Sequence, residues 1–312
     1  MKSIKRWSHL TAAGALVSLG SLSFVGLTPA SGTLAVPAFS IRLEDQLLAE
    51  LGYLPVSFQP TGLTTTSTST TSTTTTSTTT TSTTTTSSTT TTTPVSTSST
   101  TTTVPTTTTT VVKPIHHVSP TKLVPGRFEW RFTNLPNALR AQWHVGNDNV
   151  VLRGALMRFQ SVNGLATTGA IDGTTWKTLV RAALQHRVDP STYNYVYVNK
   201  ALPETVSLYA NNQLVYKTLV NTGVAGAPTA DGTFPVYLRY VTTTMSGVDT
   251  SGKHYHDTGI PWVSYFNGGD ALHGFIRASY GYPQSLGCVE MTFNSAASIW
   301  PRTPIGTLVT VR

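Results

Sequence analysis

The sequence predicts a multidomain protein: a small all-α domain of three helices, interrupted by a disordered Thr-rich insertion, followed by a mainly β domain. Apolar residues recur at the spacing of a helix in residues 41–51, 147–162 and 174–185. From Tyr195 onward apolar and polar residues alternate, as they do in strands. Residues 64–110 are almost pure Thr and Ser, which cannot form a core. The chain has 312 residues, enough for about two domains.

The start of the chain predicts export. Basic residues precede an apolar stretch, residues 10–27, and small residues around Ala30 and Ala35 follow it. This order is typical of a cleaved signal peptide. An uncleaved anchor is the alternative, because about 18 apolar residues can just span a bilayer. Residues 1–35 are therefore predicted to be a signal peptide or a membrane anchor, and the anchor would associate the protein with the membrane.

The charge balance argues against a nucleic-acid partner. The formal net charge is +8 and the pI is about 9.6. The Lys and Arg residues are scattered, however, and the chain carries no DNA- or RNA-binding motif. A mildly basic exported protein favours anionic surroundings such as a cell wall or a membrane surface. We therefore expect a location in the cell wall or on the extracytoplasmic face of the membrane.

Residues 36–60 carry the first predicted helix. In residues 41–51 the leucines share one face, and Gly52 is a natural C-terminal stop. A helix this short does not fold alone, so it needs partners elsewhere in the chain. The Thr-rich insertion, residues 61–112, follows it. We expect this insertion to be a solvated spacer, although such tracts in exported proteins also occur as O-glycosylated stalks.

Residues 113–189 carry the other two predicted helices. Asn147 or Asp148 is expected to cap the first, and Asn163 with Gly164 ends it. The apolar faces of the two helices follow the same periodicity; they contain Val151, Leu152, Ala155, Leu156 and Phe159 in one, and Trp176, Leu179, Val180 and Ala183 in the other.

These helical segments resemble a peptidoglycan-binding domain of the three-helix type. The resemblance is carried by ALMRFQ at 155–160, by NGL, TG and ID in the loop that follows, and by TW at 175–176. LGYLP at 51–55 fits the turn after the first helix of that family. The resemblance implies that the Thr-rich segment is an insertion within one domain, that the aromatic residues of 128–143 rejoin its fold, and that glycan is a partner. A generic helical module whose aromatic residues form only its core is the alternative.

Residues 190–312 are predicted to be mainly β. The first strands are expected at 195–197, 206–208 and 214–216, the last two joined by a turn at Asn211-Asn212. Further strands are expected at 233–241, 262–266, 272–276 and 308–311, and a helix at 294–300. A domain of this length is large enough to bury its own core.

Cys288 is the only cysteine of the chain, so it forms no internal disulfide. It is a spare buried thiol, an intermolecular link or a nucleophile. His273 lies fifteen positions before it and can take its proton, and the resulting ion pair would lower the thiol pKa. The Gly287 and Cys288 N–H groups are candidate donors to an oxyanion. A nucleophile, a base and oxyanion donors together favour acyl transfer.

The surroundings of these residues resemble the catalytic domain of L,D-transpeptidases of the YkuD type. APTADGTF at 227–234, HG at 273–274 and SLGCV at 285–289 match the segments characteristic of that family. The resemblance implies a mostly β sandwich with Cys288 under a flap. It also implies that His273 accepts the thiol proton, that the Gly274 carbonyl orients His273, and that Ser285 supports the loop.

The implied reaction has two steps. Cys288 attacks the carbonyl before D-Ala in a tetrapeptide stem of peptidoglycan, which releases D-Ala and leaves a thioester. An amine of a second stem, typically that of diaminopimelate, then resolves the thioester and forms a 3→3 cross-link. No metal or organic cofactor is implied. The same thiol would serve an L,D-carboxypeptidase, in which water resolves the thioester.

Substrate-binding residues are predicted less directly. The aromatic candidates for the groove are Trp262, Tyr265 and Tyr280, and the polar candidates for stem carboxylates or carbonyls are Asn267 and Arg277. Each is equally a packing residue. His254, His256 and Asp257 do not form a closed zinc set, so we expect no metal site.

Two positions depart from the family pattern. Leu286 stands where a histidine usually precedes Gly-Cys, and Glu290 stands where an arginine is frequent. If these departures mark a decayed site, the protein would be a non-catalytic cell-wall-binding protein, which is the third alternative.

Overall fold

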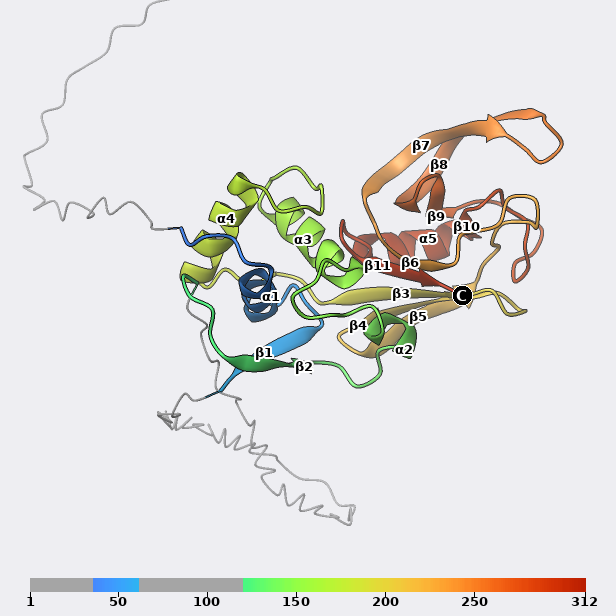
Figure 1. The fold of residues 1–312 in the computed structure, drawn as a ribbon. Coiled ribbons are helices and arrows are strands. Elements are labelled where there is room, and N and C mark those ends of the chain that lie inside the picture. Colours follow the sequence, from blue (N-terminus) through green and yellow to red (C-terminus); the bar gives the residue numbers. More distant parts are fainter. Residues whose placement is uncertain (1–35, 62–119) are drawn as a thin grey trace, which may run out of the picture. The chain divides into compact units, whose positions relative to one another are not determined.

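The computed structural model describes residues 36–61 and 120–312. The predicted signal segment and the Thr-rich insertion lie outside the described residues. In this part of the chain no helix is long and apolar enough to cross a membrane. We refer to residues 36–61 and 120–189 as the N-terminal module and to residues 190–312 as the β domain (Figure 1).

The helices of the module are α1 (Ile41–Glu50), the single turn α2 (Asn137–Arg140), α3 (Val150–Val162) and α4 (Gly173–Leu184). Asn149, rather than Asn147 or Asp148, caps α3, and its side chain accepts a hydrogen bond from the Leu152 N–H. Asp172 caps α4 in the same way. Gly52 follows α1 with a φ of +81°, a backbone conformation that ends a helix and favours glycine.

The prediction of an all-α module is wrong. Strands β1 (Val56–Pro60) and β2 (Gly126–Trp130) form a two-stranded antiparallel sheet with Val56 opposite Trp130. Each strand is short, and the two lie on opposite sides of the Thr-rich segment, so no local hairpin pattern marks them. Leu47, Phe159 and Leu179 belong to one buried cluster, against which Phe128 and Trp130 of β2 pack.

The strands of the β domain are β3 (Asn194–Asn199), β4 (Thr205–Ala210), β5 (Gln213–Leu219), β6 (Gly232–Pro235), β7 (Leu238–Val248), β8 (His254–Asn267), β9 (Asp270–Gly274), β10 (Val289–Met291) and β11 (Leu308–Val311). They form a five-stranded sheet in the order β5-β4-β3-β11-β6 and a four-stranded sheet in the order β10-β9-β8-β7. Helix α5 (Phe293–Ile299) and a 3-10 turn (Trp300–Arg302) precede β11. The prediction of a mainly β domain is confirmed.

The core of the β domain lies between its two sheets. Val196 and Val309 of the five-stranded sheet belong to the same buried cluster as Leu272 and Val289 of the four-stranded sheet. Asn211 and Asn212 form the tight turn between β4 and β5 with φ values of 43° and 78°. The strand expected at 233–241 is divided between β6 and β7, with the buried Val236 at the break.

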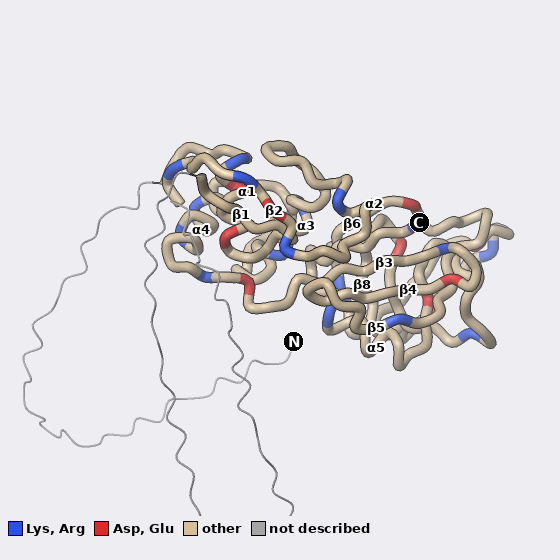
Figure 2. The backbone as a smooth tube through the Cα atoms, turned by 90° about the horizontal axis from the view of Figure 1, so that it is seen from below, with Lys and Arg blue, Asp and Glu red and all other residues tan. Residues whose placement is uncertain are grey.

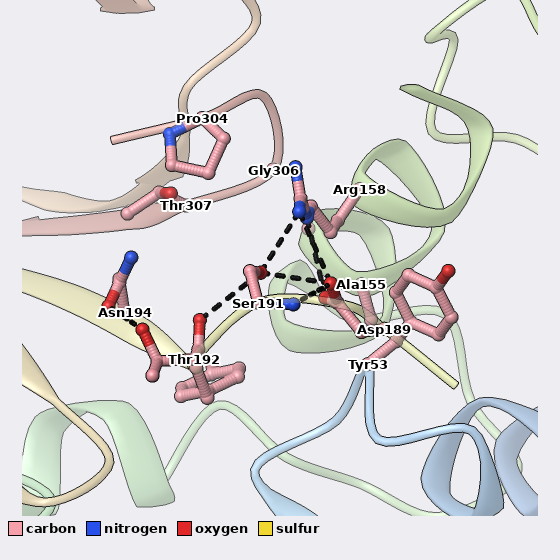
Figure 3. Close-up of a pocket in the computed structure, with 12 residues that line it drawn as sticks. Tyr53, Ala155, Arg158, Asp189, Ser191, Thr192, Asn194, Pro304, Gly306 and Thr307 are labelled. Atoms are coloured by element: carbon pink, nitrogen blue, oxygen red, sulfur yellow. Dashed lines mark hydrogen bonds and ion pairs between the residues drawn. The ribbon is translucent and has the colours of Figure 1, made fainter. Parts of the chain in front are cut away.

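The module is joined to the β domain by close backbone packing and by a hydrogen bond from Arg158, whose guanidinium is also paired with Asp189 inside the module. A Cβ atom at Gly154 of α3 would lie 2.7 Å from the Gly306 carbonyl oxygen, so only glycine allows this approach. Arg158 of α3 donates to the Asp189 carboxylate at 3.2 and 3.3 Å and to the Ser191 hydroxyl at 2.9 Å (Figure 3). Tyr195 and Leu308 of the β domain also join the buried cluster of the module.

Candidate active site

Two neighbouring parallel strands bring Cys288 and His273 to one place. In the β9–β10 pair, Leu272 is opposite Val289 and His273 is opposite Glu290, and Cys288 immediately precedes β10. His273 and Cys288 line the same cavity of about 840 Å³. The cavity is covered on one side by the β7–β8 hairpin, which extends beyond the rest of its sheet in Figure 1.

The His273 ring is buried and held in one orientation. Its Nδ1 lies 3.0 Å from the Gly274 carbonyl oxygen, and its exposed fraction is 2%. Because a carbonyl only accepts, Nδ1 carries the proton in this contact and Nε2 is left as the basic nitrogen. Burial lowers the pKa of His273 below its usual range, so the imidazole is neutral at neutral pH. The ring is therefore prepared to accept a proton.

The Cys288 thiol is half-buried and its Sγ lies 3.6 Å from the Gly269 carbonyl oxygen. Burial raises the pKa of Cys288 to about 12, against a hydrogen bond with the Ala271 backbone that lowers it. The nearby Glu290 and Asp270 carboxylates raise this pKa further. Burial of the two groups therefore favours a neutral thiol beside a neutral imidazole over the ion pair expected from the sequence.

The turn before Cys288 is held by Ser285. The Ser285 hydroxyl donates to the Cys288 carbonyl at 2.6 Å and accepts a 3.2 Å hydrogen bond from the Gly287 N–H. The predicted oxyanion donor at Gly287 is therefore engaged inside the turn. Gly287 has a φ of +112°, and a Cβ atom there would lie 2.6 Å from Oδ1 of Asp270.

Arg277 reaches the cavity, but its charge is already matched. Its Nε and Nη2 donate to the two carboxylate oxygens of Glu290 at 2.7 and 2.8 Å. Nη2 also donates to the Gln284 carbonyl, and the guanidinium lies over the Phe275 ring. Arg277 and Glu290 thus form a two-point pair where the sequence departs from the family pattern.

Of the other predicted substrate-binding residues, one lines the cavity and three do not. Tyr265 lines the cavity. Trp262 does not; it packs against Trp300 at a ring distance of 5.5 Å. Asn267 and Tyr280 are not among the residues that line the cavity. Asn267 donates to Asp270 at 3.3 Å, and the Tyr280 hydroxyl donates to the Phe275 carbonyl at 2.5 Å.

Sequence reasoning assigned no role in the site to Met245, Tyr255, Asp257 or Asp270. Met245, Tyr255 and Asp257 line the cavity from the hairpin, and Asp270 lines it from the start of β9. Long-range strand pairing places them there, and no local motif marks them. His254 and His256 are exposed, and among the described residues no group of three or more His, Cys, Asp or Glu side chains is placed to hold a metal ion.

Comparison with known proteins agrees with this geometry. Residues 193–311 match the family model of the L,D-transpeptidase catalytic domain. The matched residues include both sheets of the β domain, the cavity between β9, β10 and the β7–β8 hairpin, and both Cys288 and His273. A comparison with curated proteins found no match.

Several solved structures resemble part of this chain weakly. An L,D-transpeptidase from Mycobacterium smegmatis is 18% identical with a TM-score of 0.36, over 39% of this chain and 59% of that protein. The catalytic domain of the E. faecium L,D-transpeptidase is 19% identical with a TM-score of 0.35, over 40% of this chain and 100% of that one. An L,D-transpeptidase from Stackebrandtia nassauensis is 19% identical with a TM-score of 0.31, over 56% of this chain and 86% of that one. TM-scores of this size do not establish a shared fold. The identification of residues 193–311 as an L,D-transpeptidase catalytic domain therefore rests on the family match.

Proposed function

With residues 193–311 as an L,D-transpeptidase-type catalytic domain, we propose that the protein is an exported enzyme that forms 3→3 cross-links in peptidoglycan through a thioester on Cys288. The observation that carries the proposal is the shared cavity of Cys288 and His273, in which the Gly274 carbonyl fixes the imidazole. A nucleophile next to an oriented base is the arrangement that acyl transfer needs.

The first half-reaction releases D-Ala. Nε2 of His273 takes the thiol proton as Sγ of Cys288 attacks the carbonyl before D-Ala of a tetrapeptide stem. Proton transfer and attack occur together, because burial disfavours a separate thiolate. The intermediate collapses when the C–N bond breaks, and the imidazolium returns the proton to the departing D-Ala amine.

Oxyanion stabilisation falls to the backbone of the Cys288 turn. Since the Gly287 N–H donates to Ser285, we propose the Cys288 N–H as the first donor. Ser285 acts as a positioning residue, because its hydroxyl holds the carbonyl of the nucleophile itself. Tyr265 lines the same cavity and provides an apolar wall for the stem.

We propose that the N-terminal module holds the enzyme on its polymeric substrate by binding peptidoglycan glycan. A groove of about 430 Å³ on the module combines apolar residues such as Phe39 and Ile171 with polar ones such as Glu44 and Thr168. Apolar surface with a few convergent polar groups suits a sugar ligand. Binding of purified cell wall that survives Cys288→Ala and is lost on Phe39→Ala would support this role.

Product analysis tests the proposed reaction. The protein is mixed with a disaccharide-tetrapeptide, with and without a tripeptide acceptor that carries a side-chain amine. Loss of D-Ala together with a new linked dimer supports transpeptidation. Loss of D-Ala with only tripeptide identifies an L,D-carboxypeptidase. No product from well-folded protein and several stem types leaves a non-catalytic wall-binding protein.

A further inference from the structure

The charges that line the Cys288 cavity are unbalanced. Four carboxylates line it against one guanidinium, that of Arg277; they belong to Asp249, Asp257, Asp270 and Glu290. Glu290 and Arg277 neutralise each other through their two-point pair. His273 adds no charge at neutral pH, because it is buried in its neutral form. The cavity therefore favours a cationic group over a further carboxylate.

Only one of the three remaining carboxylates, that of Asp257, has no hydrogen-bond or ion-pair partner in the described part of the chain. Asp270 accepts hydrogen bonds from the Ala230 N–H and the Asn267 amide. Asp249 accepts from Ser251 and from the Lys253 N–H within the hairpin turn. Asp257 accepts no hydrogen bond and forms no ion pair with the described residues, although its side chain is half-buried. A carboxylate that lines a cavity without such a partner is free to pair with a cationic group of a ligand.

The position of Asp257 suits a ligand at the reacting centre. It lies on β8 opposite Met245 of β7, and both residues face the cavity that contains Cys288. It is close enough to both His273 and Arg277 to influence their titration. Its neighbours His256 and Thr258 alternate to the exposed side of the hairpin. Asp257 is thus an anionic group on the cavity roof, near the base and the nucleophile.

We propose that Asp257 is the specificity residue that captures the second substrate, by binding the ammonium group of the amine that resolves the thioester. This inference rests on the proposed transpeptidation. The ligand class is a primary ammonium on a flexible side chain. Such a group would satisfy the Asp257 carboxylate and would be held beside the acyl group on Cys288.

The chemistry that follows capture is balanced. The bound ammonium releases one proton to solvent, and the free amine nitrogen attacks the thioester carbon. The new C–N bond forms and the C–S bond breaks. The second amine proton passes through His273 to the departing sulfur, which restores the thiol, and the amide keeps the third. Asp257 stabilises the charged form of the acceptor amine, which binds but does not attack. Its substitution should therefore change the acceptor KM more than the rate of attack on the thioester.

The test compares the native protein with Asp257→Asn, Asp257→Glu and, as a matched control on the exposed side of the same strand, His256→Asn. D-Ala release and linked dimer are measured against the concentration of a tripeptide acceptor with a side-chain amine. We expect Asp257→Asn to raise the acceptor KM about tenfold and to change D-Ala release much less than that. Asp257→Glu should recover much of the affinity, and His256→Asn should behave as the native protein.

A neutral nucleophile separates charge from shape. Hydroxylamine is uncharged at neutral pH and also cleaves thioesters, so Asp257→Asn should leave its reaction with the acyl-enzyme unchanged. An unchanged acceptor KM in Asp257→Asn would overturn the inference, as would an equal loss of D-Ala release, dimer formation and hydroxylamine cleavage. If the native protein forms no thioester at all, the proposed function fails first, and the inference fails with it.

Discussion

Arg277 and Glu290 form a two-point ion pair in the wall of the cavity that contains Cys288, with N–O distances of 2.7 and 2.8 Å. The Glu290 side chain is 6% exposed and that of Arg277 is 29% exposed. Glu290 also lies opposite His273 in the β9–β10 pair, so the ion pair is built into the strand that positions the base.

Breaking this pair should cost stability. Glu290→Gln leaves the Arg277 guanidinium without its counter-charge, and we expect a loss of about 1–3 kcal/mol in the free energy of unfolding, measured by urea denaturation. The pair of Lys200 with the 60% exposed Asp231 provides the control, because exposed pairs contribute little. Asp231→Asn should change the stability by less than about 0.5 kcal/mol. Equal effects of the two substitutions would contradict a special role for the buried pair.

The pH dependence of the acylation rate should have one limb. Because the pKa of His273 is lowered, its imidazole is neutral, and able to accept a proton, at pH values below those usual for histidine. Burial raises the pKa of the Cys288 thiol, so we expect its ionisation to add no limb near pH 9. We expect kcat/KM for D-Ala release to rise through the acid range and to remain level from neutral pH to about pH 10. A bell-shaped profile of kcat/KM against pH, with a limb near pH 9, would indicate instead that a separate thiolate is the attacking species.

The N-terminal module should lose stability as pH rises. Burial raises the pKa of Glu44 to about 8 and that of Asp45 to about 7. Because the folded state holds these protons more tightly than the unfolded state, the stabilising contribution is full below about pH 4 and is lost as pH rises through 7–8. Glu44→Gln should therefore stabilise the protein at pH 8, by about 2 kcal/mol, and have little effect at pH 4. Thermal unfolding at both pH values measures this, and a stabilisation that does not depend on pH would argue against a protonated Glu44.

Gly287 should not tolerate a side chain. Its φ of +112° is unfavourable for any other residue, and a Cβ atom would lie 2.6 Å from Asp270. We expect Gly287→Ala to destabilise the protein by about 2 kcal/mol and to reduce D-Ala release at least tenfold. Gly173→Ala is the control, because no atom lies within 4 Å of its added Cβ and its φ is ordinary. A fully active Gly287→Ala protein would show that the turn is not rigid.

The sequence predicts what local patterns encode. Helices α3 and α4, the Asn211-Asn212 turn and helix α5 follow from periodicity, turn residues and capping residues. The β1–β2 sheet does not, because its partners lie far apart in the chain. The length of the β7–β8 hairpin could not be predicted from the sequence either. Residues 242–246 of β7 are largely polar on both faces and show no clear alternation of apolar and polar residues.

The same limit applies to the site. Cys288 and His273 stand out by residue type, but only the parallel pairing of β9 and β10 brings them to one cavity. Asp257 and Asp270 carry no motif and become visible only through the fold. Glu290 is notable in the sequence as a departure, and its meaning depends on Arg277, thirteen positions away, which the strand arrangement brings to it.

The central claim is that Cys288 forms a thioester with the help of His273. Intact-mass spectrometry of the protein incubated with a disaccharide-tetrapeptide tests it most directly, alongside Cys288→Ala and His273→Ala. We predict a covalent adduct whose added mass is that of the disaccharide-tetrapeptide minus D-Ala, located on Cys288 by peptide mapping. It should be absent in Cys288→Ala and formed at least a hundredfold more slowly in His273→Ala. An adduct that persists in Cys288→Ala, or release of D-Ala by that variant, would contradict the account.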